Sequence, residues 1–340
     1  MHTMRQLGGS SLRVTPVIFG AWAIGGWMWG GNDENDSIAA IRAALDAGVN
    51  AIDTAAIYGM GASEELVRKA LAGIPRDKVV IATKCGMRWD DPKEEGSDPW
   101  PQKDNSGRDW TIRRNAKPHS IAYEAEQSLR RLGTDVIDLY QLHWPDKTTP
   151  PEESFAALEK LRRQGKVRAI GVSNHDVEGL RRCRHVGQLA SVQPPYSVIQ
   201  RGAEKDILPF CRENGIGAIV YSPLERGLLT GKVSPDRQFP PGDHRVNHRL
   251  FTVEFRRRAL TALESLRPIA DKHKASFTQI IINWTFRQPG VTAAIVGARN
   301  ARQAAHNAGA LGLSLSEEEE KTIRAAFDAI SADAARIRGN

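Results

Sequence analysis

Residues 136–172 read VIDLYQLHWPDKTTPPEESFAALEKLRRQGKVRAIGV, and this stretch holds one complete strand–helix–strand unit. Residues 136–142 are predicted as a strand, residues 152–164 as a helix that ends at Gly165, and residues 169–172 as a second strand. The two apolar runs are short and lack regular polar alternation. We therefore expect both strands to be buried on both faces, as in a parallel sheet.

The same unit repeats along the rest of the chain. Further strands are predicted at 17–22, 51–54, 79–83, 191–193, 218–221 and 292–296, and further helices at 37–47, 63–72, 118–132, 176–186, 205–213, 254–273 and 278–286. Eight strands with helices between them favour a closed (β/α)8 TIM barrel over an open doubly wound sheet. Since no linker or low-complexity segment interrupts the pattern, residues 1–340 are predicted to form a single α/β domain.

Two connections are unusually long. Residues 85–117 are polar and contain three tryptophans, and residues 224–251 contain three prolines. Long ordered loops are uncommon in compact domains and tend to be functional, so we expect both on the catalytic face. Ser316 and Glu319 form a capping-box signature, which predicts a C-terminal helix through Ile330. We interpret this helix as a lid over one end of the barrel.

The composition excludes several classes of protein. Apolar residues make up 41% and charged residues 26%, and 47 basic against 40 acidic residues give a net charge of +7. No run of 18 apolar residues or signal-peptide core is present, so we expect neither membrane insertion nor secretion. The basic residues are scattered, which argues against nucleic-acid binding. Three cysteines without CxxC spacing indicate a reduced, cytoplasmic protein. The sequence does not determine the oligomeric state, and a monomer is our working expectation.

Several familiar motifs are absent. There is no GxGxxG turn and no GxSxG, which argues against a Rossmann domain and an α/β-hydrolase. Residues 227–233 resemble a P-loop but are one residue too short and end in Val233. His244 and His248 are spaced like metal ligands, yet Pro241 and Gly242 place them in a loop. We predict no metal site.

Polar side chains follow three successive predicted strands. Asp53 closes the second strand and Tyr58 follows in its loop, while Lys84 and His143 lie at the ends of the third and fourth strands. In a barrel these ends share the face that builds active sites. An ammonium group lowers the pKa of a neighbouring phenol, a carboxylate keeps the ammonium charged, and an imidazole orients a substrate oxygen. Each residue alone has an ordinary structural interpretation, but together they suit proton transfer to a carbonyl or from an alcohol.

A wider set of motifs lies in register with the predicted strands. These are Asp53-Thr54-Ala55 with Tyr58-Gly59, Thr83-Lys84, residues 139–143, Gly171-Val172-Ser173-Asn174, Tyr221-Ser222-Pro223-Leu224, residues 227–232 and Gly297-Ala298-Arg299. With them the chain resembles the aldo-keto reductases over nearly its whole length. The resemblance implies that Tyr58 is the general acid, that Lys84 and Asp53 tune it, and that His143 positions the carbonyl. It also implies a nicotinamide cofactor extended across the barrel mouth.

The resemblance further implies the cofactor contacts. Trp22 and Asp53 would border the nicotinamide, Ser173, Asn174 and Gln193 would hold its carboxamide, and Tyr221 would stack on its ring. Ser222, Leu224, Gly227 and Lys232 would follow the pyrophosphate, and Gly297, Arg299, Gln303 and Asn307 would surround the adenosine. Arg299 can bind a 2′-phosphate in a bidentate manner, and residues 297–303 contain no acid, so NADP(H) is the expected cofactor. His306 stands where the family commonly has glutamate, which affects the expected adenine pocket.

Tryptophans dominate the expected substrate pocket. It comprises Trp22, Trp29, Tyr58, Trp89, His143 and Trp144, with Trp27 nearby. Such a pocket can hold apolar rings or polyols, although the same tryptophans could simply pack the long loops. Within the family the chain resembles bacterial stress-associated and glycerol-dehydrogenase-like reductases, so the expected substrate is a small hydroxy-aldehyde such as glyceraldehyde. Cys85, beside Lys84, is expected to be a buried neutral thiol.

Two alternative functions remain open from the sequence. One is a nicotinamide-binding regulatory or redox-sensing subunit, resembling the channel β subunits that share this fold. The other is a metal-dependent barrel lyase or hydrolase that uses Asp53, Asp138 and His143, although a mid-strand Asp138 would be a poor open ligand. The complete set of Asp53, Tyr58, Lys84 and His143 favours a reductase. Turnover of an aldehyde with NADPH would separate it from a regulatory subunit, and metal analysis of the purified protein would test the metal-dependent alternative.

Overall fold

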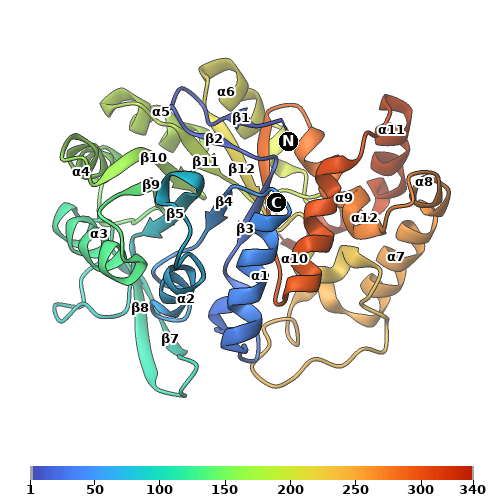
Figure 1. The fold of residues 1–340 in the computed structure, drawn as a ribbon, viewed down its shortest axis with the longest axis horizontal. Helices are drawn as coiled ribbons and strands as arrows, with labels where there is room; N and C mark the ends of the chain where they lie inside the picture. The colour runs from blue at the N-terminus through green and yellow to red at the C-terminus, as the bar shows by residue number, and fades with distance from the viewer. Residues whose placement is uncertain (1–2, 339–340) are drawn as a thin grey trace.

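A computed structural model describes residues 3–338, and its centre is a closed barrel of eight parallel strands (Figure 1). In chain order these are β3 (Val17–Gly20), β4 (Ala51–Asp53), β5 (Val80–Cys85), β9 (Ile137–Leu142), β10 (Val167–Ser173), β11 (Ser191–Gln193), β12 (Gly217–Tyr221) and β13 (Val291–Gly297). β13 pairs with β3 and closes the ring. The predicted TIM barrel is confirmed, and each of its eight strands lies where the sequence pattern placed it.

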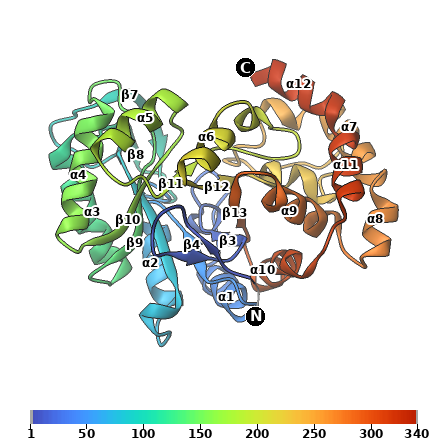
Figure 2. The same ribbon diagram turned by 90° about the horizontal axis from the view of Figure 1, so that it is seen from above.

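Helices surround this barrel, as Figure 2 shows from above. They are α1 (Glu34–Asp46), α2 (Ala62–Ala70), α3 (Pro118–Leu132), α4 (Pro151–Arg163), α5 (Val177–Val186), α6 (Ile207–Asn214), α7 (Val253–Glu264), α8 (Arg267–Lys272), α9 (Phe277–Arg287) and α10 (Ala301–Ala308). The single helix predicted over 254–273 is two helices. Pro268 lies in the first turn of α8, and a proline cannot continue a preceding helix because it lacks the N–H group. Among residues 3–338, no helix is long and apolar enough to cross a membrane.

The barrel interior is layered. One apolar cluster fills its lower part, with Leu7, Leu12, Val14, Ile18, Ala51, Ala82, Leu139, Ala169, Ala190, Ile219, Ala293 and Ile295. Side chains two residues apart on a strand share a face. Asp53, Lys84 and Tyr221 follow members of this cluster by two residues, so they also point inward, one layer nearer the carboxyl end. The barrel interior therefore has a polar layer next to this apolar cluster, which we call the floor of the barrel.

A short N-terminal hairpin covers the floor. β1 (Arg5–Gln6) pairs with β2 (Arg13–Val14), and Leu7, Leu12 and Val14 pack into the interior cluster. The hairpin lies at the top of Figure 1. It closes the amino-terminal end of the barrel, which leaves the carboxyl end for chemistry.

The C-terminal helices do not form the predicted lid. α11 (Glu317–Ala326) and α12 (Asp328–Arg338) lie on the outer side of the molecule, beside α7–α9 (Figures 1 and 2). Trp284 Nε1 of α9 donates a hydrogen bond to Glu320 O at 3.1 Å. Ile323 and Phe327 are buried in the core between helices and barrel. The lid interpretation is wrong because the apolar side of these helices packs against other helices.

Residues 85–117 form a small sheet, which the sequence analysis treated as a loop. β6 (Met87–Arg88), β8 (Asp109–Arg114) and β7 (Ser97–Lys103) pair antiparallel in that spatial order, and β7–β8 project as a hairpin (Figure 1). Pro99 and Pro101 argue against a central strand, but β7 is an edge strand, where a missing N–H group is tolerated.

Candidate active site

A buried ion pair forms the centre of the polar layer. Lys84 Nζ donates to Asp53 Oδ1 at 2.7 Å, to Thr54 O at 2.9 Å and to Tyr58 OH at 3.4 Å. Asp53 and Lys84 are almost completely buried. Burial alone would lower the pKa of Lys84, but Asp53 and Tyr58 raise it above its ordinary value. Lys84 is therefore a fixed cation that faces the phenol.

Burial decides the protonation state of Tyr58. It raises the pKa of the phenol, Lys84 lowers that pKa, and Asp53 raises it again, with a net rise. Lys84 lowers the pKa as the sequence predicted, but the larger effect of burial is visible only in the structure. Since the ordinary pKa of tyrosine is about 10, Tyr58 carries its proton at neutral pH. The structure therefore presents a proton donor.

His143 lies beside this donor. Its ring centroid is 5.7 Å from that of Tyr58, and the two rings are at 78°. Burial, followed by the charges of Lys84 and Arg114, lowers the pKa of His143 well below its usual value. His143 is consequently neutral at pH 7. A neutral imidazole still has one N–H group that can donate to a carbonyl oxygen.

The residues expected at the nicotinamide are linked by hydrogen bonds. Ser173 Oγ donates to Gln193 O at 2.8 Å, Asn174 Nδ2 to Ser173 Oγ at 3.1 Å, and Tyr221 OH to Asn174 Oδ1 at 2.9 Å. Gln193 Nε2 also donates to Asp53 Oδ2 at 2.8 Å. This last contact gives Gln193 a role that the sequence did not reveal, since it fixes the carboxylate that holds Lys84.

The loop after β12 has an unusual backbone. Ser222, Glu225, Arg226 and Gly227 have φ values of 61°, 46°, 57° and 95°. Backbone hydrogen bonds close these turns, from Glu225 N to Ser222 O at 2.9 Å and from Gly227 N to Leu224 O at 3.0 Å. The loop includes the expected pyrophosphate residues Ser222, Leu224 and Gly227. Lys232 follows it and is exposed.

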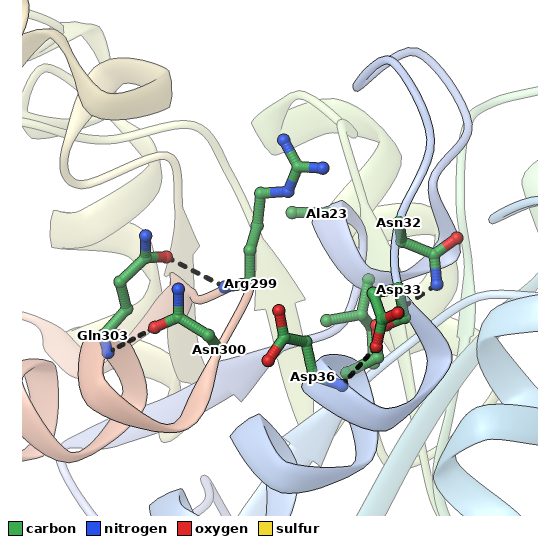
Figure 3. A pocket seen from close by; sticks show the side chains of 9 residues that line it. Ala23, Asn32, Asp33, Asp36, Arg299, Asn300 and Gln303 are labelled. Carbon is green, nitrogen blue, oxygen red and sulfur yellow. Dashed lines mark hydrogen bonds between the residues drawn. The ribbon is translucent and has the colours of Figure 1, made fainter.

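A cavity of about 310 Å³ lies between the start of α1 and the segment that follows β13 (Figure 3). It is lined by Ala23, Ile24, Asn32, Asp33, Asp36, Ser37, Arg299, Asn300 and Gln303. Arg299 Nη2 donates to Gly31 O at 2.6 Å, and the Arg299 backbone N donates to Gln303 Oε1 at 2.9 Å. Two of the expected adenosine residues therefore meet here. Gly297 and Asn307 are joined nearby, where Asn307 Nδ2 donates to Gly297 O at 3.1 Å.

Two carboxylates share this cavity and were missed in the sequence. Asp33 caps α1 by accepting a hydrogen bond from Asp36 N, and Asp36 lines the cavity from the same helix (Figure 3). Both acids lie outside residues 297–303, the acid-free stretch from which a 2′-phosphate was predicted. Helix α1 brings these two acids from a distant part of the chain, so the cavity offers both a cation and anions.

The tryptophans expected around the substrate lie close to one another. Trp22, Trp89 and Trp144 pack with Tyr58 and the buried Trp27 in one cluster. Trp29 joins through Trp22, at a centroid distance of 5.3 Å. The ring of His244 lies 5.0 Å from Trp22 and 4.7 Å from Trp29. The side chains expected around the substrate thus pack against one another, and His244, which sequence spacing had suggested only as a metal ligand, packs against two of them.

The metal-dependent alternative lacks its ligands. Asp138 accepts hydrogen bonds from Arg76 at 2.6 Å and from Ile81 N at 2.8 Å, and it pairs with Arg168 at 3.0 Å. It does not join Asp53 and His143. No group of three His, Cys, Asp or Glu side chains suited to a metal occurs within residues 3–338. Cys85 is buried, and burial raises the pKa of its thiol well above the usual value, as expected for a neutral thiol.

Comparison with known proteins agrees with this geometry. The Aldo/keto reductase family model matches residues 16–328. Aldo-keto reductase YhdN of Bacillus subtilis is 38% identical over 320 residues, covering 94% of this chain and 91% of that protein. The NADH-specific methylglyoxal reductase of Escherichia coli is 36% identical over 329 residues, covering 95% and 98%.

A solved structure is similar over the whole barrel. The glycerol dehydrogenase AKR11B4 from Gluconobacter oxydans matches with a TM-score of 0.84 and 38% identity, covering 99% of this chain and 96% of that one. The chain belongs to the aldo/keto reductase family. It is accordingly an oxidoreductase of a family that binds nicotinamide cofactors and acts on small carbonyl compounds.

Proposed function

We propose that this chain reduces a small aldehyde or ketone to the alcohol with NADPH, and that Tyr58 is the proton donor. The observation that supports this proposal is the buried line of Asp53, Lys84 and a protonated Tyr58 beside a neutral His143. The leading substrate is a hydroxy-aldehyde such as glyceraldehyde. The three cysteines are unpaired, as in proteins of reducing compartments, so we place the reaction in the cytoplasm. We propose that the protein acts as a monomer.

Each residue of the centre has one task in this mechanism. A nicotinamide held by Ser173, Asn174, Gln193 and Tyr221 would supply the hydride for the carbonyl carbon. Tyr58 donates its proton to the carbonyl oxygen, so that the C=O double bond becomes a C–O single bond with one O–H and one new C–H. His143 donates a hydrogen bond that orients this oxygen. Lys84 stabilises the phenolate that remains, and Asp53 holds Lys84 in place. The reverse sequence oxidises the alcohol.

The preference for NADPH depends on Arg299 in this proposal. A guanidinium can bind a 2′-phosphate through two parallel hydrogen bonds. Arg299 lines the cavity beside Gln303, and Lys232 follows the pyrophosphate loop. The relative from Escherichia coli is NADH-specific, and Asp36 offers a carboxylate that repels phosphate. Both cofactors must therefore be compared in any test.

The test is turnover by the wild type and by Tyr58→Phe. We expect the wild type to oxidise NADPH in the presence of aldehydes from a panel. The loss of NADPH absorbance measures the rate. The variant should bind NADPH normally and lose on the order of 10²–10⁴-fold in kcat, the usual effect of removing a general acid. A variant with more than half the wild-type turnover would remove Tyr58 from the mechanism. Cofactor binding without turnover of any carbonyl compound would instead support a regulatory or redox-sensing subunit.

A further inference from the structure

A buried carboxyl group outside the barrel holds the turn that follows the strand of Lys84. Glu124 lies on α3, and both of its oxygens accept from Gly86 N, at 3.0 and 3.1 Å. Gly86 is two residues beyond Lys84, and its φ of 88° turns the chain out of β5. Burying an ionisable group is costly, so the benefit must lie in what this contact holds in place.

The segment that Glu124 holds is bonded to several parts of the active centre. Three consecutive carbonyl oxygens each accept from the backbone of another segment: Lys84 O from Ala56 N at 3.4 Å, Cys85 O from His143 N at 2.9 Å, and Gly86 O from Asn115 N at 3.2 Å. Ala56 leads to Tyr58, two residues further on. A shift of residues 84–86 would therefore move Lys84 and His143 relative to Tyr58.

The polar neighbours of Glu124 come from its own helix, from β6 and the residues after it, and from the barrel. Ser120 Oγ donates to Glu124 Oε1 at 3.4 Å, and Arg88 Nη1 donates to the same hydroxyl oxygen at 3.0 Å. Asp90 pairs with Arg88 at 2.7 Å. Two neutral groups face Glu124 from the barrel, the thiol of Cys85 on β5 and the phenol of Tyr140 on β9.

Burial determines the charge of Glu124. It raises the pKa of this carboxyl group to about 8, although the charge of Arg88 and the N–H group of Gly86 lower it. Glu124 is therefore mostly protonated at pH 7 and mostly ionised at pH 9. A carboxylate accepts a stronger hydrogen bond than a neutral carboxyl group does, so the bond from Gly86 N becomes stronger as the pH rises.

We propose that Glu124 is a positioning residue of the reaction, which fixes residues 84–86 and thereby aligns Lys84 and His143 with Tyr58. It acts through the backbone, since its oxygens bond Gly86 N and no side chain of the active centre. This inference rests on the proposed reductase function and adds to it a residue of the outer helices, which the sequence analysis did not single out.

The pH dependence of reduction separates Glu124 from the residues of the centre. Tyr58 and Lys84 have pKa values raised above ordinary values near 10, and the pKa of His143 is well below 6.5. None of these three groups changes its charge near pH 8. A change in the rate of the chemical step around this pH therefore reports on Glu124.

The experiment measures single-turnover reduction of an aldehyde by the NADPH-loaded protein between pH 7 and 9. We expect the wild-type rate to rise by up to about fivefold around pH 8, the difference between a neutral and a charge-assisted hydrogen bond. Glu124→Gln keeps a carbonyl oxygen for Gly86 N but cannot ionise. Its rate should stay at the wild-type value of pH 7 over the whole range.

Two further variants separate positioning from general structural support. Glu124→Leu leaves Gly86 N without its acceptor and should lower the rate by roughly 10–10²-fold, the usual effect of misplaced reacting groups, with an unchanged Kd for NADPH. Glu159→Gln is the matched control. Glu159 is also buried and accepts from a backbone N–H, that of Gln188 at 3.2 Å, but at the amino-terminal end of the barrel. Its pH profile should match the wild type.

The outcomes are distinct. A wild-type rate that is flat around pH 8, a Glu124→Gln rate that rises as the wild-type rate does, or a Glu124→Leu variant that loses only thermal stability would overturn this inference and leave the reductase function intact. No reduction of any aldehyde by the wild type would overturn the proposed function, and the role of Glu124 with it. If Glu124→Leu does not fold, the pH profile of Glu124→Gln decides.

Discussion

At the scale of single residues, burial and charge act against each other on Tyr58. Lys84 lowers the pKa of the phenol while burial and Asp53 raise it. Reduction requires the protonated phenol, and the raised pKa of Tyr58 favours that form. Oxidation needs the phenolate, so its rate should rise with pH until Tyr58 has lost its proton.

Lys84→Met tests this balance. Losing the cation removes the effect that lowers the pKa of Tyr58, so the alkaline limb of alcohol oxidation should move to higher pH. Turnover should fall at least as far as in Tyr58→Phe. The measurement is kcat/KM for oxidation as a function of pH. An alkaline limb at the wild-type position would contradict the role given to Lys84.

Asp36 and Arg299 form the second residue-level test. Because Asp36 lines the same cavity as Arg299, Asp36→Asn should strengthen NADPH binding by up to roughly fivefold, the effect of removing a repulsion of ~1 kcal/mol in water, and leave NADH binding unchanged or weaker. Arg299→Ala should weaken NADPH by roughly 10–100-fold and affect NADH little. Fluorescence titration with both cofactors, at low and high salt, measures this. Equal shifts for both cofactors would show that neither side chain reads the 2′ position.

The sequence placed Asp53, Tyr58, Lys84 and His143 near one another because strand ends of a barrel share one face, and the structure brings them together. Asp53, Lys84 and His143 could be identified from their positions at the strand ends of the repeat alone. Asp36 and His244 could not be found in this way. Asp36 lies on α1 and His244 in the long loop after β12, and no local pattern records which distant segments meet.

At the scale of elements, the capping box of α11 can be tested directly. Ser316 accepts from Glu319 N, and Glu319 accepts from Ser316 N at 2.8 Å. Burial would raise the pKa of Glu319, but bonds from Lys272, Ser316 N and His273 lower it to about 2. A lowered pKa stabilises the fold above the unfolded-state value, about 4.3 for glutamate, and this gain disappears as the pH falls towards 2.

Glu319→Gln should therefore destabilise the protein at pH 7, and the difference from wild type should shrink towards pH 2. Ser316→Ala, which removes the cap without removing a charge, should cost about 1 kcal/mol at both ends of this range. Urea unfolding at several pH values gives the change in the free energy of unfolding for each variant. A Glu319→Gln effect that does not change with pH would assign the glutamate a purely steric role.

Helices and strands were predicted correctly where a segment had enough residues to show its hydrophobic period. The barrel strands and the helices between them are buried in the expected pattern. β1 and β2 have two residues each, too few for any period, and α10 presents alanines as its buried apolar residues. The β7 edge strand was hidden by its prolines. Such elements depend on tertiary partners and not on their own sequence.

At the scale of the whole molecule, the two ends of the barrel are specialised. The hairpin of β1 and β2 seals an apolar floor, while the long loops and the β7–β8 hairpin belong to the opposite end. One continuous core of barrel and helices runs from Val17 to Ala334. The interior cluster and this outer core share every barrel strand except β11, so we expect the chain to unfold as one unit.

Thermal unfolding with and without cofactor tests this expectation. A ligand at 100 times its Kd stabilises the native state by about 2.7 kcal/mol. With an unfolding entropy of about 2.1 cal/mol/K per residue over 340 residues, the Tm should rise by about 4 °C in a single transition. At the same NADPH concentration Arg299→Ala should gain less than about 2 °C, because its affinity is lower. Two resolved transitions, with only one shifted by NADPH, would contradict a single cooperative domain.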